Sequence, residues 1–426
     1  MGDGILVLEE RAVKPLTLLK EKDFTLLLIG QFVSALGDKL HYVALGVLIF
    51  RLTGSALELG KMTFATFLPY LLFGLIAGAY VDRWDKKRTM ISADLFRAVI
   101  VGLIPFLIGY SINLVYLLTF LSTTANLFFS PAKMAVIPAI FTKEKILTAT
   151  SMAETVENIT EILGYALAGV LIMFFPIQKV FYFDSLTFLC SALAIFAMSF
   201  KFETRDQADR TLDKENEPHI FQDIIEGLSY IWKTKKLVFT LLSYCFVLLI
   251  FSGFSPLIFV YALDTLKTST AGLGVLEASA AVGITIGSLA LSVWGNRMSK
   301  EQLVLWGYFI SGITIAILGI FPWYPLALIG FFMTGVSNAM FLIPIQSIFQ
   351  EETVAPMRGR VFSARFALTR VAFMGSVSIL TFGATKIGVE KVFVFSGLSL
   401  LLGTMILLGY TYVQAKKVSE TISKTV

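Results

Sequence analysis

Twelve long apolar stretches constrain this chain more than any other feature of its sequence. Each runs for roughly 20 to 27 residues, long enough to span a hydrocarbon core of about 30 Å at ~1.5 Å rise per residue. Backbone groups in lipid must find their hydrogen bonds within the chain, so each stretch is predicted to be a helix. The predicted spans are 25–50, 56–81, 88–110, 113–138, 150–175, 178–200, 238–262, 270–295, 302–321, 324–349, 361–385 and 389–413.

Composition agrees with lipid as the solvent and argues against several classes of protein. The chain is 56% hydrophobic and only 15% charged, whereas a soluble domain is about 25% charged. Cys190 and Cys245 lie inside apolar stretches, and His41 and His219 are the only histidines, so we expect neither a disulfide scaffold nor a metal centre. The sequence has no nucleotide-binding loop and no nucleophile–histidine pairing, so we expect no enzyme and no cofactor.

The basic residues indicate how the chain is oriented in the membrane. If the N-terminus is cytoplasmic, the inner segments hold 24 of the 35 lysines and arginines, and the outer loops hold 5. Cytoplasmic loops are the ones that carry an excess of Lys and Arg. We therefore expect a multi-pass protein of a bacterial plasma or inner membrane with both termini in the cytoplasm. These loops also account for the net charge of +5, so we expect no nucleic-acid partner.

A polar segment at 201–237 divides the spans six from six. The expected parts are a cytoplasmic N-terminal segment (1–23), a six-helix bundle (24–200), a cytoplasmic linker (201–237), a second six-helix bundle (238–413) and a cytoplasmic tail (414–426). Apolar residues recur at helical spacing in the linker and predict an amphipathic helix on the inner leaflet; a plain solvated linker is the alternative. These residues are Ile220, Ile224, Leu228 and Ile231.

The two halves of the sequence also share residues at matching positions. Pro131 and Pro344 occupy matching places in the fourth and tenth spans, and Gly74 and Gly287 do so in the second and eighth, at the same offset of 213. Duplicated six-helix bundles that enclose a midplane site are a common plan for transporters.

The most specific local pattern is GAYVDRWDKKR at 78–88, which links the second and third spans. Gly78 would let a neighbouring helix come close. Asp82 could accept hydrogen bonds from the N-terminus of another helix, whose dipole favours an anion. The basic residues that follow would face inner-leaflet phosphates. The alternative is a charged tight turn that only obeys the charge rule for inner loops.

This pattern resembles the signature loop of the major facilitator superfamily: glycine, three residues, Asp-Arg, one residue, usually glycine, then a basic pair. Asp85 stands here at the usual glycine position, so the turn geometry is expected to differ. The resemblance covers nearly the whole chain, and further segments are similar to the branch with macrolide efflux proteins and enterobactin exporters. They are GQFVSALGD (30–38), LTGSALELG (52–60), DLFR (94–97), FDSLTFLCSAL (183–193), EGLSYIWKTKKL (226–237) and RGRVFS (358–363).

The resemblance implies an all-α membrane protein with about twelve transmembrane helices in two six-helix bundles, the major facilitator fold. It also implies efflux, commonly by exchange with protons. The segment at 30–38 is similar to the first helix of lysophospholipid transporters as well, so that function stays open.

Polar residues inside the spans are the candidates for a proton and substrate cavity, because charge in lipid is costly. Asp38 shares one helix face with Gln31 and His41, whereas Lys39 points about 100° away from it. Acids on one stripe of the fifth span, above all Glu161 near the midplane, would suit proton exchange. The cavity candidates are Asp38, Glu161, Glu157, Asn126, Glu277, Gln31 and His41.

A second set of residues is predicted to form a cytoplasmic gate. Arg365 and Arg370 begin the eleventh span and are interpreted as partners for acids such as Asp82. The gate candidates are Gly78, Asp82, Arg83, Lys86, Lys87, Arg88, Asp94, Arg97, Arg365 and Arg370.

We therefore expect a secondary exporter of an amphipathic organic compound, such as a drug or a siderophore. It would work in the lipid bilayer as a monomer, by alternating access and proton antiport. The alternatives are a lysophospholipid flippase of the same fold and, from another class, a non-transporting receptor or assembly factor.

Overall fold

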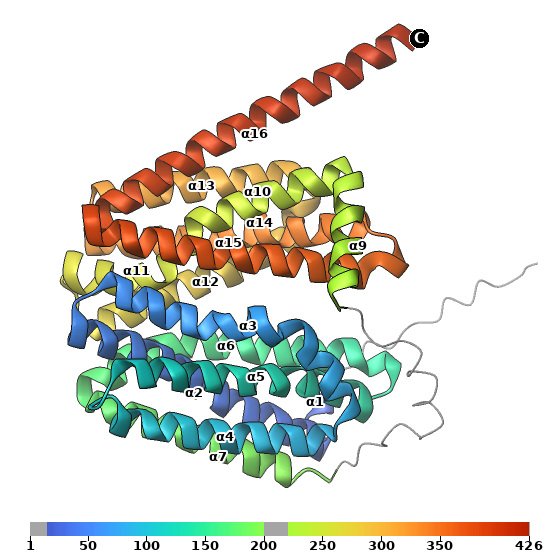
Figure 1. Cartoon of the computed structure of the whole chain (residues 1–426). Coiled ribbons are helices and arrows are strands. Elements are labelled where there is room, and N and C mark those ends of the chain that lie inside the picture. The colour runs from blue at the N-terminus through green and yellow to red at the C-terminus, as the bar shows by residue number, and fades with distance from the viewer. Residues whose placement is uncertain (1–14, 200–219, 426) are drawn as a thin grey trace, which may run out of the picture.

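The chain folds into two helical bundles that lie side by side. The computed structural model describes residues 15–199 and 220–425, and these contain helices and turns but no strand. Figure 1 shows the N-terminal bundle, coloured blue to green, against the C-terminal bundle, coloured yellow to red. The expected all-α membrane fold with two six-helix bundles is confirmed.

The N-terminal bundle is built from six long helices after a single turn, α1 (Pro15–Leu18). Within it α2 packs on α6 and α7, and α4 packs on α5 and α7. The six are α2 (Lys22–Thr53), α3 (Ala56–Arg83), α4 (Lys86–Leu107), α5 (Ile112–Ile140), α6 (Lys143–Phe174) and α7 (Ile177–Phe196).

The C-terminal bundle repeats this plan, with its first span divided into α10, α11 and a π-helical turn. Within it α13 packs on α14 and α16, and α12 packs on α14. The helices are α9 (Ile220–Lys233), α10 (Lys235–Phe251), α11 (Phe254–Val260), the π-helix Tyr261–Thr265, α12 (Thr270–Trp294), α13 (Lys300–Ile320), α14 (Tyr324–Glu351), α15 (Arg358–Ile387) and α16 (Val389–Thr425).

Eleven helical segments in the described residues are long and apolar enough to cross a membrane, with Lys235–Thr265 taken as one segment. The helix α3 is not among the eleven, but its 28 residues run beside α5 in the same bundle. With α3 included, the long helices correspond one for one to the twelve predicted spans.

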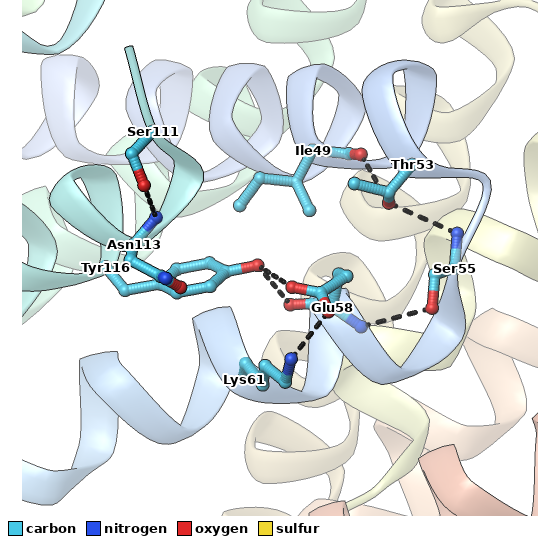
Figure 2. Close-up of polar contacts among 8 residues, drawn as sticks. All are labelled: Ile49, Thr53, Ser55, Glu58, Lys61, Ser111, Asn113 and Tyr116. Atoms are coloured by element: carbon cyan, nitrogen blue, oxygen red, sulfur yellow. Dashed lines mark hydrogen bonds and ion pairs between the residues drawn. The ribbon is translucent and has the colours of Figure 1, made fainter. Parts of the chain in front are cut away.

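Just after the turn between α2 and α3, one carboxylate of α3 links this helix to α5 (Figure 2). Gly54 ends α2 with a left-handed backbone (φ 62°), a conformation that glycine adopts without steric cost. Ser55 then caps α3 by accepting a hydrogen bond from the backbone N–H of Glu58. The carboxylate of Glu58 pairs with Lys61 at 2.6 Å and accepts a hydrogen bond from Tyr116 of α5, also at 2.6 Å.

The loop between α3 and α4 is short because Asp85 begins the next helix directly. Its carboxylate Oδ1 accepts a hydrogen bond from the backbone N–H of Arg88 at 2.8 Å, and Asp85 is the N-cap of α4. This explains the departure from the usual glycine: an aspartate can satisfy a helix N-terminus with its side chain, which glycine cannot.

The helix α9 occupies the stretch of the linker where an amphipathic helix was predicted. Ile231 is 1% exposed, and Ile224 and Leu228 pack partly buried against the same core. Arg360 of α15 pairs with Asp223 of α9 at 2.8 Å. The apolar stripe of α9 therefore packs on α15 and α10, and the place of this helix on the inner leaflet stays a prediction. The polar part of the linker, 200–219, lies outside the described residues.

The bundles meet along two pairs of helices, α6 with α12 and α3 with α15, and through α11 against α2 and α3. The Tyr42 hydroxyl lies 2.9 Å from Ser255 Oγ, and the rings of Phe67 and Phe373 are 4.3 Å apart. Both contacts lie close to the middle of the helices or in the half of the molecule that contains the end of α2. We call the opposite side, where α2 begins, the terminal side.

The close helix approach expected at Gly78 is wrong for this conformation. Within the described residues, nothing lies within 4 Å of where a Cβ on Gly78 would stand. One turn earlier in α3, a Cβ on Gly74 would lie 3.2 Å from the ring of Phe366 in α15. The described residues thus leave open space beside Gly78, whereas Gly74 faces α15.

Candidate functional site

A cavity of about 690 Å³ lies between the two bundles and is lined by both of them. Aromatic and apolar side chains form most of its wall, and a few ionisable groups face it. The N-terminal bundle contributes Asp38, Lys39, His41, Tyr42, Phe67, Tyr70, Arg97, Asn126 and Tyr165, and the C-terminal bundle contributes Phe251, Phe254, Glu277, Phe331, Asn338, Phe373 and Phe393, among others.

Asp38 forms an ion pair with Arg97 at the cavity wall. The guanidinium of Arg97 also donates to Asn126 Oδ1 at 3.4 Å and lies over the ring of Phe188 at 3.9 Å. The side chain of Arg97 is only 6% exposed, whereas that of Asp38 is 41% exposed. The pair therefore fixes a buried cation on α4 and leaves one carboxylate edge facing the cavity.

Lys39 points away from Asp38, as its helical position predicted, and pairs with an acid on a different helix. Its ammonium lies 2.7 Å from Glu161 Oε1 of α6 and 4.9 Å from the centre of the Tyr165 ring. It also donates to the Tyr165 hydroxyl at 3.4 Å. Glu161 itself stands behind Lys39 and does not line the cavity, so Lys39 carries the charge that the cavity meets.

Glu277 faces the same cavity from α12, in the other bundle. Lys39 and Glu161 are near enough to act on it electrostatically. Within the described residues, however, no hydrogen bond or ion pair holds its carboxylate. Glu277 is thus the cavity acid without a fixed counter-ion.

His41 and Gln31 lie on the same face of α2 as Asp38 but differ in their surroundings. His41 lines the cavity, and its Nδ1 lies 3.1 Å from Oδ2 of the buried Asp184 in α7. Thr187 donates a hydrogen bond to the other oxygen of Asp184 at 3.2 Å. Gln31 is buried at 7% exposure, nearer the terminal side, and does not line the cavity.

Glu157 is also outside the cavity. Its carboxylate forms an ion pair with Lys133 of α5, further towards the terminal side. Of the seven predicted cavity residues, the structure therefore brings Asp38, His41, Asn126 and Glu277 together at the wall. Glu161 acts through Lys39, and Gln31 and Glu157 are separate.

The residues predicted for the gate do not lie together in one place. Lys86 donates to backbone oxygens at the end of α3, and Lys87 donates to Phe196 and Met198 at the end of α7. Arg83 and Arg88 are exposed around a shallow hollow that Trp84, Asp85, Phe96 and Phe128 also line. The side chain of Asp82 lies outside the described part, although its backbone belongs to α3.

The other gate candidates lie deeper in the bundles. Asp94 is fully buried, and Arg97, one turn on, faces the cavity and not the loop. Arg365 lies over two rings of its own bundle, with centroids at 4.8 and 5.0 Å. Arg370 lies 5.2 Å from the ring of Tyr70, so it spans the interface between α15 and α3.

Sequence reasoning missed Lys39, Tyr42 and Tyr165 as cavity residues. For Lys39 a signal was present, because a charge in the middle of a span is a functional candidate by default. The tyrosines had no such signal, since aromatic residues are frequent in every span.

A cavity between two six-helix membrane bundles, walled by aromatic rings and ion pairs, defines the class of membrane transport proteins. The chain belongs to the Major Facilitator Superfamily, whose family profile matches residues 27–373 and 240–425.

Similar proteins include macrolide efflux protein A of Streptococcus pyogenes, 27% identical over 382 residues, which covers 86% of this chain and 91% of that protein. The multidrug efflux pump Tap of Mycolicibacterium fortuitum is 26% identical over 403 residues, covering 90% and 94%. Among solved structures, a bacterial homologue of the iron transporter ferroportin has a TM-score of 0.71 at 14% identity, over 91% of this chain and 98% of that chain.

Proposed function

We propose that the protein exports an amphipathic organic compound by alternating access and that it takes up protons in exchange. The observation that supports this most is the cavity of about 690 Å³ between the bundles. Its wall combines aromatic rings with a small number of charged groups, which is the chemistry that binds a partly apolar organic molecule. The relatives named for macrolide and multidrug efflux agree with a drug-like substrate.

Alternating access requires that the bundles close on one side while they part on the other. The contacts between α2 and α11 and between α6 and α12 lie away from the terminal side. On the terminal side of α3, no described residue lies within 4 Å of where a Cβ on Gly78 would stand. If the termini are cytoplasmic, as the loop charges favour, this conformation receives substrate from the cytoplasm or the inner leaflet.

Proton exchange is proposed from the carboxylates at the cavity. A carboxylate that binds a proton loses a charge that is expensive to carry through a closed, dry intermediate. Within the N-terminal bundle, Asp38 forms an ion pair with Arg97, and Glu161 forms one with Lys39. Glu277 faces the cavity from the other bundle. These three are the acids whose protonation would change the charge of the cavity.

Transport into proteoliposomes tests the function directly. Purified protein would be reconstituted, and uptake of a labelled macrolide, a labelled siderophore and a labelled lysophospholipid would be followed with and without an imposed pH gradient. We expect gradient-dependent accumulation of a drug-like substrate that a protonophore abolishes. Accumulation of lysophospholipid alone, independent of the pH gradient, would instead establish the flippase alternative. Protein-free liposomes are the control.

A further inference from the structure

Another hollow, of about 770 Å³, lies on the N-terminal bundle beside the turn that joins α3 to α4. It shares no lining residue with the cavity between the bundles. Its lining residues come from the end of α3, the first three turns of α4 and the middle of α5. Figure 1 shows α4 at the edge of the molecule that faces away from the C-terminal bundle. The hollow therefore faces the surrounding membrane and not the transport path.

The basic residues of this turn are used in two different ways. Lys86 and Lys87 donate hydrogen bonds to backbone carbonyls near the ends of α3 and α7. Arg83 and Arg88 are exposed and line the hollow, and within the described residues neither guanidinium has a hydrogen bond or an ion pair. Asp85 also lines the hollow, but its Oδ1 accepts the backbone N–H of Arg88. The described lining therefore carries two positive charges and one negative charge.

Large apolar side chains line the part of the hollow that lies away from the turn. Phe96 stands eight residues beyond Arg88 on α4, which is about 12 Å along the helix. It is 45% exposed, and Val99, one turn further, is 62% exposed. Leu121 and Phe128 of α5 line the same hollow. The hollow thus has a basic end at the turn and an apolar end that continues along the outer face of α4.

Trp84 indicates the depth of this hollow in the membrane. Its ring stacks on that of Phe128, with centroids 5.5 Å apart and an angle of 23° between the planes, and it is 47% exposed. Tryptophan is enriched where the membrane meets water, because its ring is apolar and its N–H is polar. The adjoining arginines therefore lie at the depth of lipid headgroups, and Phe96 lies at the depth of acyl chains.

We propose that this hollow binds an anionic phospholipid from the leaflet on the terminal side. The guanidinium groups of Arg83 and Arg88 bind the headgroup phosphate, since their planar sets of donors match its oxygens. One acyl chain lies against Phe96 and Leu121. A zwitterionic lipid has the phosphate but no net charge, so it binds less tightly. The lipid site does not depend on what the protein transports.

Native mass spectrometry of the full chain tests the preference for negative charge. Protein purified in a neutral detergent would be titrated with phosphatidylglycerol and with phosphatidylcholine that carries the same acyl chains. We expect the wild type to bind the first phosphatidylglycerol about tenfold more tightly than phosphatidylcholine. This comparison needs no variant, so it holds even if a variant folds poorly.

A pair of double variants tests which residues cause the preference. Arg83→Gln with Arg88→Gln should remove most of it, while the backbone N–H of Arg88 still meets Asp85. Lys143→Gln with Lys145→Gln is the matched control, because it removes two exposed charges at the start of α6, outside the hollow. The control should keep the preference of the wild type.

Fluorescence quenching of Trp84 tests where the lipid binds. The other four tryptophans would be replaced by phenylalanine; they are Trp232, Trp294, Trp306 and Trp323. Phosphatidylglycerol with brominated acyl chains should quench Trp84 at a lower concentration than brominated phosphatidylcholine does.

Three results would overturn the lipid site. The first is equal affinity of the wild type for the two lipids, or an unchanged preference in the variant that lacks both Arg83 and Arg88. The second is binding of free glycerol 3-phosphate as tight as that of the lipid, which would show that the hollow accepts a phosphate ester without an acyl chain. The third is selective lipid binding without quenching of Trp84, which would place the lipid elsewhere on the protein.

Discussion

At the scale of single residues, Asp38 and Arg97 illustrate how a buried charge constrains a transporter. Arg97 is 6% exposed and lies against Phe188, so it depends on Asp38 for its neutralising charge. We expect Asp38→Asn to destabilise the protein by about 1–3 kcal/mol, the cost of a buried polar group left poorly satisfied. Thermal unfolding in detergent should show a lower midpoint.

The double variant Asp38→Asn with Arg97→Gln removes both charges and should recover part of this loss. A coupling energy of about 0.5–3 kcal/mol is typical of contacting pairs. Asp264→Asn serves as the matched control, since Asp264 is exposed. Strict additivity of the two single effects would show that the ion pair contributes no coupling.

At the scale of a helix, the N-terminus of α4 depends on the side chain of Asp85. Its Oδ1 accepts the backbone N–H of Arg88 at 2.8 Å. Loss of such a cap costs about 0.5–2 kcal/mol, whereas glycine at the same place costs only a few tenths. We therefore expect Asp85→Ala to lower the unfolding midpoint and to speed hydrogen exchange of the first amides of α4.

Asp85→Asn keeps an oxygen at the same position and is the control, because asparagine caps as well as aspartate. If the alanine and asparagine variants were equally protected from exchange, the cap would have no part in holding this turn. Asp85→Gly should fall between them, which would explain how the family pattern tolerates glycine there.

At the scale of the whole molecule, the two bundles are in contact on the side opposite the terminal side, where α6 packs directly on the backbone of α12. A Cβ on Gly169 of α6 would lie 2.5 Å from the carbonyl oxygen of Thr270 and 2.8 Å from the Cα of Ala271. Neither backbone can move without moving α12. We expect Gly169→Ala to push α6 and α12 apart at this end and to shift the population towards the opposite conformation.

Spin labels at Tyr110 and Lys267, one in each bundle on that side, would report the shift as longer distances, after Cys190 and Cys245 have been replaced by alanine. Gly359→Ala is the control, since a Cβ there meets nothing within 4 Å. The idea of a tight closing contact fails if both glycine variants give the distance distribution of the parent.

Orientation in the membrane is a second property of the whole molecule. We expect a cysteine at Tyr110, between α4 and α5, to react with an impermeant reagent added outside intact cells. A cysteine at Lys145, near the start of α6, should be protected until the cells are opened. The reverse pattern would mean that the loop at 82–88 faces outwards and that the conformation described above opens to the exterior.

The amino-acid sequence by itself determined the helices, their number and their solvent, because these follow from local properties: the length and apolarity of each stretch and the need to satisfy backbone groups in lipid. It also predicted that Asp38, Asn126, His41 and Glu277 line the cavity, because polar groups inside membrane spans are energetically costly. Only the tertiary structure decided which acidic side chain forms an ion pair with which basic side chain. Lys39 and Glu161 are 122 residues apart in the chain, and no local pattern pairs them. That Glu277 has no ion-pair partner among the described residues follows from that pairing, because the partner of a buried acid is set by how helices pack in space and not by their spacing along the chain.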